Sequence, residues 1–299
     1  MKTVLKYVLI YFGLSIVGAI LLMFPALIIE IALNHGDISA ETLGTNTWSL
    51  VIMMLGSQLL PLYVFWKRKW CDYRFIKDPD TYRFLLWAAV GWVGFVIIAT
   101  FIQTYVPQFE WDLEFLKDIG EMSKNPLGII SVCVLAPLLE EGIFRGTIER
   151  KLLEKKDRSP WFAIVLSALA FAIVHMNLIQ GIIALTLGIF MGWIYYRTRN
   201  IWYCIFVHAL NNTVSTVAFL LTNDETGASP YSPPVNLVLL LVGIVVIYVF
   251  AQQYKKLPLT VPQEPVVMGQ PLPMEEPATM GEPLVQDQPT SMDQPEIME

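Results

Sequence analysis

Long apolar segments alternate with short polar segments along the chain up to about residue 256. Most of the apolar segments are close to the roughly 20 residues that an α-helix needs to cross the hydrocarbon core of a bilayer. This pattern predicts an all-α, polytopic membrane bundle of about eight transmembrane helices rather than a soluble globular domain. The expected spans are residues 5–33, 47–66, 84–105, 127–148, 160–175, 178–196, 201–221 and 235–250.

Two segments outside the spans have patterns of their own. Residues 109–122 place apolar and acidic residues at helical spacing, which suits a helix lying on the outer membrane surface or an ordinary polar loop. Residues 257–299 are rich in Pro, Met, Glu and Gln, and they lack the aliphatic periodicity of a core. We therefore expect a transmembrane domain over 1–256 and a disordered cytoplasmic tail over 257–299. The tail's Pro-spaced pieces could bind a partner that the sequence does not identify.

Basic residues gather in alternate loops. Lys and Arg are frequent in residues 67–83, 150–158, 197–199 and 255–256, whereas residues 34–46, 176–177 and 222–234 have none. Basic loops remain on the cytoplasmic side of a membrane. Eight spans with both termini in the cytoplasm satisfy this rule at every loop. The short soluble loops favour a prokaryotic plasma membrane.

Composition narrows the classes of partner. The chain has 299 residues, of which 55% are hydrophobic, and its formal net charge is −6. Eight of its 26 acidic residues lie in the tail, so the rest of the chain, with 20 basic residues, is nearly neutral. There is no basic surface for nucleic acid, and the expected partners are the lipid bilayer and a membrane-associated substrate. The three cysteines, Cys71, Cys133 and Cys204, have neither disulfide-framework nor zinc-knuckle spacing.

Charged residues stand out inside the fourth predicted span. Glu140, Glu141 and Arg145 lie within a long apolar segment, where charge is costly and usually marks a functional site. Glu141 and Arg145 are four residues apart, in the favoured order for an ion pair along a helix. The consecutive Glu140 points about 100° away from Glu141. We therefore expect Glu140 to remain free for another role.

Two further predicted spans carry a histidine within an apolar segment. His175 follows Phe171 by four residues, and His208 precedes Asn212 by four, so each pair shares a helix face. A carboxylate and an imidazole that share one water molecule can deprotonate it for attack on a carbonyl carbon. A second imidazole and a carboxamide can donate hydrogen bonds to the oxyanion that forms. This chemistry requires no nucleophilic side chain, and we expect no cofactor.

The three motifs together resemble a known family. Glu-Glu-x-x-x-Arg, Phe-x-x-x-His and His-x-x-x-Asn follow one another within residues 126–213. This ordered set is similar to the CAAX prenyl protease and bacteriocin-processing (CPBP, or Abi) family of intramembrane glutamate proteases. The resemblance implies an endopeptidase that cuts a membrane-associated substrate, either prenylated and CAAX-type or bacteriocin-like.

The resemblance also implies a role for each motif residue. Glu140 and His175 would activate the water molecule, and His208 with Asn212 would form the oxyanion hole. Glu141 and Arg145 match motif positions with a supporting role.

Other interpretations of the same residues remain open. Two histidines and a glutamate could bind zinc in a membrane metalloprotease, although the sequence lacks an HExxH motif. Cys204 lies four residues before His208 and could act as a nucleophile, although a buried cysteine is more often a small apolar residue. Intramembrane charges also occur in proton-coupled transporters, and a non-catalytic scaffold or immunity protein could retain the same cluster.

Overall fold

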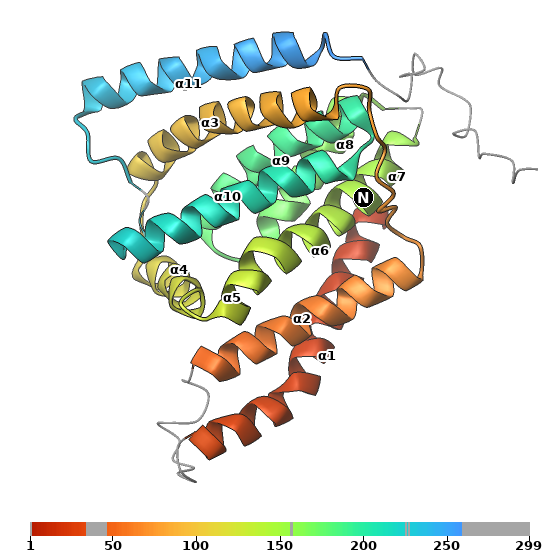
Figure 1. The fold of residues 1–299 in the computed structure, drawn as a ribbon, viewed down its shortest axis with the longest axis vertical. Helices are drawn as coiled ribbons and strands as arrows, with labels where there is room; N and C mark the ends of the chain where they lie inside the picture. The colour runs from red at the N-terminus through yellow and green to blue at the C-terminus, as the bar shows by residue number, and fades with distance from the viewer. Residues whose placement is uncertain (1, 34–46, 156–157, 225, 227, 259–299) are drawn as a thin grey trace, which may run out of the picture. The chain divides into compact units, whose positions relative to one another are not determined.

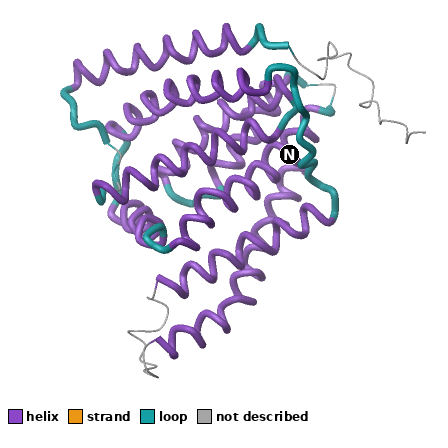
Figure 2. Tube along the Cα trace, viewed as in Figure 1, coloured by secondary structure: helices purple, strands orange, loops and turns teal. Residues whose placement is uncertain are grey.

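The computed structural model describes residues 2–33, 47–155, 158–224, 226 and 228–258, and these residues form helices and loops without a strand (Figure 2). The all-α prediction is confirmed. The predicted tail lies outside the described residues, apart from residues 257 and 258. The helices are α1 (Lys2–Leu33), α2 (Thr47–Lys67), α3 (Thr81–Tyr105), α4 (Glu110–Met122), α5 (Pro126–Ile130), η1 (Ser131–Leu135), α6 (Ala136–Ile143), η2 (Phe144–Glu149), α7 (Arg150–Leu153), α8 (Pro160–Ile173), α9 (Leu178–Thr198), α10 (Ile201–Thr222) and α11 (Pro233–Tyr254).

Seven helical segments of the described chain are long and apolar enough to cross a membrane. They correspond to seven of the eight predicted spans, with α5 to α7 forming one continuous segment. The remaining predicted span, residues 160–175, is the shorter apolar helix α8. Its 14 residues rise about 21 Å, which is less than the roughly 30 Å of a hydrocarbon core. The protein is therefore a multi-pass membrane protein with one short helix among its long ones.

Helix α8 is short because the chain turns directly after it. Met176 has a φ of 51°, in the left-handed region that a side chain with a Cβ seldom adopts within a helix. Asn177 then begins α9, because its side-chain oxygen accepts a hydrogen bond from the backbone N–H of Gln180 at 2.9 Å. His175 consequently lies in a turn between two helices and not within a helix.

The fourth span is one continuous helical segment with two π-helical stretches. These stretches, η1 and η2, lie on either side of α6, which carries Glu140 and Glu141. A π-helical stretch shifts the backbone hydrogen bonds from i+4 to i+5 and leaves carbonyl groups available to other donors. Such stretches are frequent at functional sites.

The helices pack around this interrupted segment. Helix α6 contacts α2 on one side and α10 on the other, and η2 contacts α8 (Figure 1). Helices α1 and α2 form a hairpin, and α11 packs along α3. The segment that carries the two glutamates is thus enclosed by neighbouring helices, which can supply polar partners to it.

Residues 110–122 form a helix, α4, which is one of the two structures that their sequence left open. Asp112 is buried, whereas Phe109, Trp111 and Phe115 are exposed beside it. An amphipathic helix with exposed aromatic residues is suited to the membrane surface. Its position on the outer surface stays a prediction.

Candidate active site

A buried ion pair forms the centre of the site. Arg145 Nη1 donates to Glu141 Oε1 at 2.9 Å, and both side chains are fully buried. The predicted pairing along the helix is confirmed. Arg145 Nη2 also donates to the backbone oxygen of Gly188 on α9 at 3.1 Å, and its guanidinium carbon lies 4.7 Å from the centroid of the Phe171 ring. These contacts satisfy a charge that would otherwise be very costly at this depth.

Glu141 also contacts His208, which sequence spacing did not predict. Its Oε1 atom lies 2.8 Å from His208 Nδ1. A carboxylate that already accepts from an arginine is an acceptor, so Nδ1 is the donor in this hydrogen bond. The contact joins α6 to α10 across 67 residues of sequence. Glu141 therefore orients His208 while Arg145 holds Glu141.

Glu140 stays outside the ion pair. Its Oε2 atom lies 3.7 Å from His208 Nε2, which is too long for a hydrogen bond, and its side chain is 18% exposed. The two glutamates are adjacent in sequence but point in different directions, as expected on a helix. One carboxylate is thus fixed and buried, and the other is partly accessible beside the histidine.

His175 joins the cluster through Phe171. Its Nδ1 atom lies 2.7 Å from the backbone oxygen of Phe171, and because a carbonyl oxygen only accepts, Nδ1 is the donor. In the neutral ring, Nε2 then carries the lone pair and can accept a proton or a hydrogen bond. The Phe171 ring packs edge-on against His175 at 4.8 Å and against His208 at 5.7 Å, measured between ring centroids. One aromatic ring therefore separates the two histidines and sets their spacing.

Asn212 is oriented by the π-helical stretch η1. The Ala136 N–H donates to the oxygen of Ser131, five residues back. The corresponding donor for Val132 would be residue 137, but Pro137 has no N–H. Asn212 Nδ2 supplies the missing hydrogen bond to Val132 O at 2.9 Å. An amide nitrogen has two protons, so one remains available for a ligand.

Other carbonyl groups of the same segment also bind side-chain hydroxyls. Ser167 donates to Phe144 O at 2.8 Å, Thr147 to Gly142 O at 3.0 Å, and Tyr73 to Leu138 O at 3.0 Å. Tyr73 comes from the loop after α2, and nothing in its sequence context marks it as a neighbour of α6. Two of these contacts tie the segment to its neighbours, one to α8 through Ser167 and one to the loop after α2 through Tyr73.

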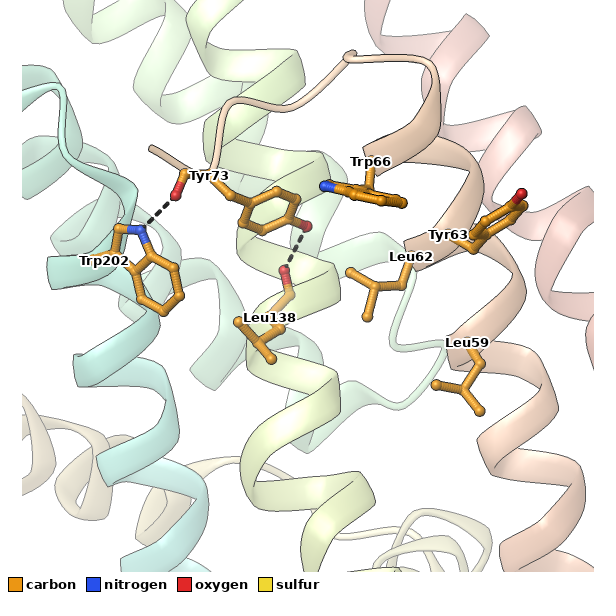
Figure 3. Close-up of a pocket in the computed structure, with 7 residues that line it drawn as sticks. All are labelled: Leu59, Leu62, Tyr63, Trp66, Tyr73, Leu138 and Trp202. Atoms are coloured by element: carbon orange, nitrogen blue, oxygen red, sulfur yellow. Dashed lines mark hydrogen bonds between the residues drawn. The ribbon is translucent and has the colours of Figure 1, made fainter. Parts of the chain in front are cut away.

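An apolar groove of about 400 Å³ lies beside this segment, between α2 and α10 (Figure 3). Its polar groups are already satisfied, because Tyr73 OH donates to Leu138 O and Trp202 Nε1 donates to Tyr73 O at 2.8 Å. One lining residue, Leu138, belongs to α6, the helix that also carries Glu140. The residues that line it are Leu59, Leu62, Tyr63, Trp66, Tyr73, Leu138 and Trp202.

Cys204 shares a helix with His208 but has a different partner. Its Sγ atom donates to Met191 O at 3.3 Å, and the side chain is fully buried. Within the described residues, no group of three or more His, Cys, Asp and Glu side chains is arranged to hold a metal ion.

The fold and the site define a class of protein. It is a multi-pass helical membrane protein with a buried cluster of Glu141, Arg145 and His208. The partly exposed Glu140 lies beside this cluster, and His175 packs against the same Phe171 ring as His208. Residues 122–214 match the family described as type II CAAX prenyl endopeptidase, Rce1-like. The matched residues include every candidate site residue from Glu140 to Asn212.

Two bacterial proteins are similar to parts of the chain. YdiL of Bacillus subtilis (strain 168), which bears the name of a membrane peptidase, is 34% identical over 140 residues, or 43% of this chain and 54% of YdiL. The membrane-embedded CAAX protease MroQ of Staphylococcus aureus (strain USA300) is 27% identical over 158 residues, or 50% of this chain and 63% of MroQ. The matched stretches thus span less than two thirds of either relative. No solved structure matches the chain.

Proposed function

We propose that this protein is an intramembrane endopeptidase that hydrolyses a peptide bond of a membrane-associated substrate. The observation that carries the proposal is the difference in environment between the two adjacent glutamates. Glu141 is bound by both Arg145 and His208, whereas Glu140 is partly exposed and has no hydrogen bond to either. This arrangement leaves one carboxylate available as a base beside an imidazole whose orientation is fixed.

The proposed mechanism assigns one step to each residue. A water molecule donates to Glu140 and to His175 Nε2, and Glu140 takes its proton as the oxygen attacks the carbonyl carbon. A protonated His208, whose Nδ1–H is held by Glu141, donates its Nε2–H to the oxyanion, and the free proton of Asn212 Nδ2 provides a second hydrogen bond. Glu140 then returns the proton to the leaving amine. Glu141 and Arg145 hold His208 in position throughout.

Peptide cleavage by purified protein in liposomes tests this proposal. Glu140→Gln removes the base but keeps the size of the side chain, and we expect a loss of roughly 10²–10⁴-fold in the cleavage rate. Glu154→Gln changes a well-exposed glutamate at the end of α7 and is the matched control, expected to cleave at the wild-type rate. Equal cleavage by wild type and Glu140→Gln would refute the assignment and favour a transporter or scaffold role.

The zinc and thiol alternatives predict different results in the same assay. Zinc catalysis predicts a loss of cleavage after incubation with a strong chelator and recovery on adding Zn²⁺. A cysteine nucleophile predicts that Cys204→Ala abolishes cleavage. We expect cleavage to survive the chelator and the Cys204→Ala substitution. Cys204 is a poor nucleophile because it is buried and its Sγ is bonded to Met191 O.

The apolar groove supports a lipidated substrate. An isoprenoid chain is apolar and flexible, and the groove presents aromatic and aliphatic side chains beside α6, the helix that carries Glu140. The family description names a prenyl endopeptidase, so we propose that a prenylated peptide places its lipid there. Leu62→Trp, which fills the groove, should raise KM for a farnesylated peptide and leave KM for the same peptide without the lipid unchanged. An unchanged KM for both would favour a non-lipidated, bacteriocin-like substrate.

We also propose a bacterial plasma membrane and two cytoplasmic termini, with the short helix α8 crossing as the eighth span beside the seven longer ones. The named relatives are bacterial, and the basic loops alternate along the chain as the positive-inside rule requires. Accessibility of single cysteines introduced at position 69 and position 230 to a membrane-impermeant reagent tests the orientation. We expect labelling of intact cells at position 230 and not at position 69.

A further inference from the structure

His175 lies in the turn between α8 and α9. A side chain in a turn keeps a fixed position when residues of another element contact the turn. Residues 174–177 connect α8 to α9, and Met176 has a left-handed φ of 51°. Within the turn, the ring of His175 is held by the Phe171 carbonyl, which belongs to the end of α8 itself. This bond does not fix the position of the turn relative to Glu140, so contacts with other elements must do so.

Asp112 on α4 makes these contacts. Its Oδ1 atom accepts a hydrogen bond from the backbone N–H of Leu178 at 2.9 Å. Its backbone oxygen accepts another from Asn177 Nδ2 at 3.0 Å. The two bonded residues come two and three positions after His175. Asp112 is fully buried although α4 exposes Trp111 before it and Phe115 after it.

The charge of Asp112 suits this position. The Leu178 N–H is one of the free donors at the N-terminus of α9, where a negative charge is favourable. Asp112 Oδ2 is buried and has no hydrogen-bond partner among the described residues. A buried, half-satisfied carboxylate in a surface helix is costly, so its contact with the turn is a specific one.

We propose that Asp112 is a positioning residue for His175, and that α4 acts as a clamp on the turn between α8 and α9. This inference rests on the proposed function, because it assumes that His175 takes part in cleavage. Asp112 itself touches neither the reacting water nor the glutamates. Its effect on the reaction passes through Asn177 and Leu178 to the imidazole.

Asp112→Ala tests the clamp, with Asp118→Ala, an exposed acid on the same helix, as the matched control. We expect Asp112→Ala to lower kcat by roughly ten-fold or more with little change in KM, since a misplaced catalytic group can cost 10²-fold. Asp112→Asn keeps an acceptor for the Leu178 N–H and should restore most of kcat. Asp118→Ala should equal the wild type.

A double-mutant experiment separates positioning from a general structural role. In a His175→Ala background, Asp112→Ala should cause no further loss of the residual cleavage, whereas in a His208→Ala background it should still cause a loss. If Asp112→Ala fails to fold, Asn177→Asp keeps the acceptor for the Gln180 N–H and removes the donor to Asp112, and it should lower kcat in the same way.

Two outcomes would overturn the inference while leaving the proposed function intact. One is wild-type kcat in folded Asp112→Ala or Asn177→Asp. The other is an equal further loss in both histidine backgrounds. Absence of cleavage by the wild type would instead refute the proposed function.

Discussion

Pro137 removes one N–H group from the helix that carries Glu140, and the effect reaches a different helix. Val132 O has no backbone donor at residue 137 and is bonded by Asn212 Nδ2 at 2.9 Å. This bond fixes the amide that we assign to the oxyanion hole. Pro137, which has no reactive group, thus orients Asn212, to which we assign a catalytic role.

Replacing this proline should separate stability from activity. In Pro137→Ala the new N–H can donate to Val132 O and displace Asn212 from it. We expect little change in stability, because one hydrogen bond to Val132 O replaces another, and kcat to fall by roughly ten-fold. Thermal unfolding in detergent and the cleavage assay measure the two effects. Pro126→Ala, at the first position of α5, is the control, since a proline there displaces no helical bond. Full activity in Pro137→Ala would contradict the account.

Sequence spacing predicted some of the contacts among the site residues and not others. Glu141 and Arg145 lie one helical turn apart, so their pairing follows from local geometry. The contact between Glu141 and His208 joins two helices 67 residues apart and depends on how α6 and α10 pack. Asp112 and Tyr73 come from segments outside the predicted spans, and no local pattern connects them to the turn after α8 or to α6.

The helical hairpin of α1 and α2 depends on two glycines. Gly18 and Gly56 face one another so closely that a Cβ on either would overlap the backbone oxygen of the other. Small residues allow this approach, which is how membrane helices commonly associate. Tyr11 on α1 packs against Phe144 of η2, with ring centroids 6.4 Å apart, so the hairpin also supports the segment that carries the glutamates.

Gly56→Ala should loosen the hairpin. The added methyl group must push the two backbones apart, and overpacking of this kind typically costs about 1–3 kcal/mol. Gly13→Ala is the matched control on α1, because a Cβ at Gly13 has nothing within 4 Å. We expect thermal unfolding in detergent to show a lower midpoint for Gly56→Ala and an unchanged or higher midpoint for Gly13→Ala. The same midpoint for both variants would show that the close approach is not needed.

The apolar pattern predicted the helices well and their interruptions poorly. The expected limits of the long spans lie within a few residues of those observed, because hydrophobicity decides which residues can face lipid. Hydrophobicity does not distinguish an α-turn from a π-turn, so η1 and η2 had no signal beyond Pro137 and Gly142. Helix α8 is equally apolar throughout, and its early end depends on the backbone conformation of Met176.

For the molecule as a whole, burial shields the thiols of the described chain. The three cysteines are free and buried, in a loop, in η1 and in α10. Burial raises the pKa of the Cys71 thiol, which lies in the loop after α2, to about 12. The folded protein should therefore react slowly with thiol reagents at neutral pH, since the thiolate is the reactive form.

The raised pKa of Cys71 also predicts how stability depends on pH. Below pH 9 the Cys71 thiol is neutral in both the folded and the unfolded protein. Above pH 9 the unfolded chain loses the thiol proton before the folded protein does. Stability is thus complete below the unfolded pKa and falls as pH rises towards 12. We expect the wild type to lose about 1 kcal/mol relative to Cys71→Ala between pH 8 and pH 10. Parallel pH profiles for the two proteins in detergent unfolding would contradict the burial of this thiol.

The central claim is that side chains from α6 and from the turn after α8 act on one water molecule. A double-mutant cycle of cleavage rates in liposomes, with Glu140→Gln, His175→Ala and the combined variant, tests it most directly. Residues that act on the same water lose their effects together, so we predict that the combined variant cleaves no more slowly than the worse single variant. Losses that multiply in the combined variant would contradict the account, because they would mean that Glu140 and His175 act independently.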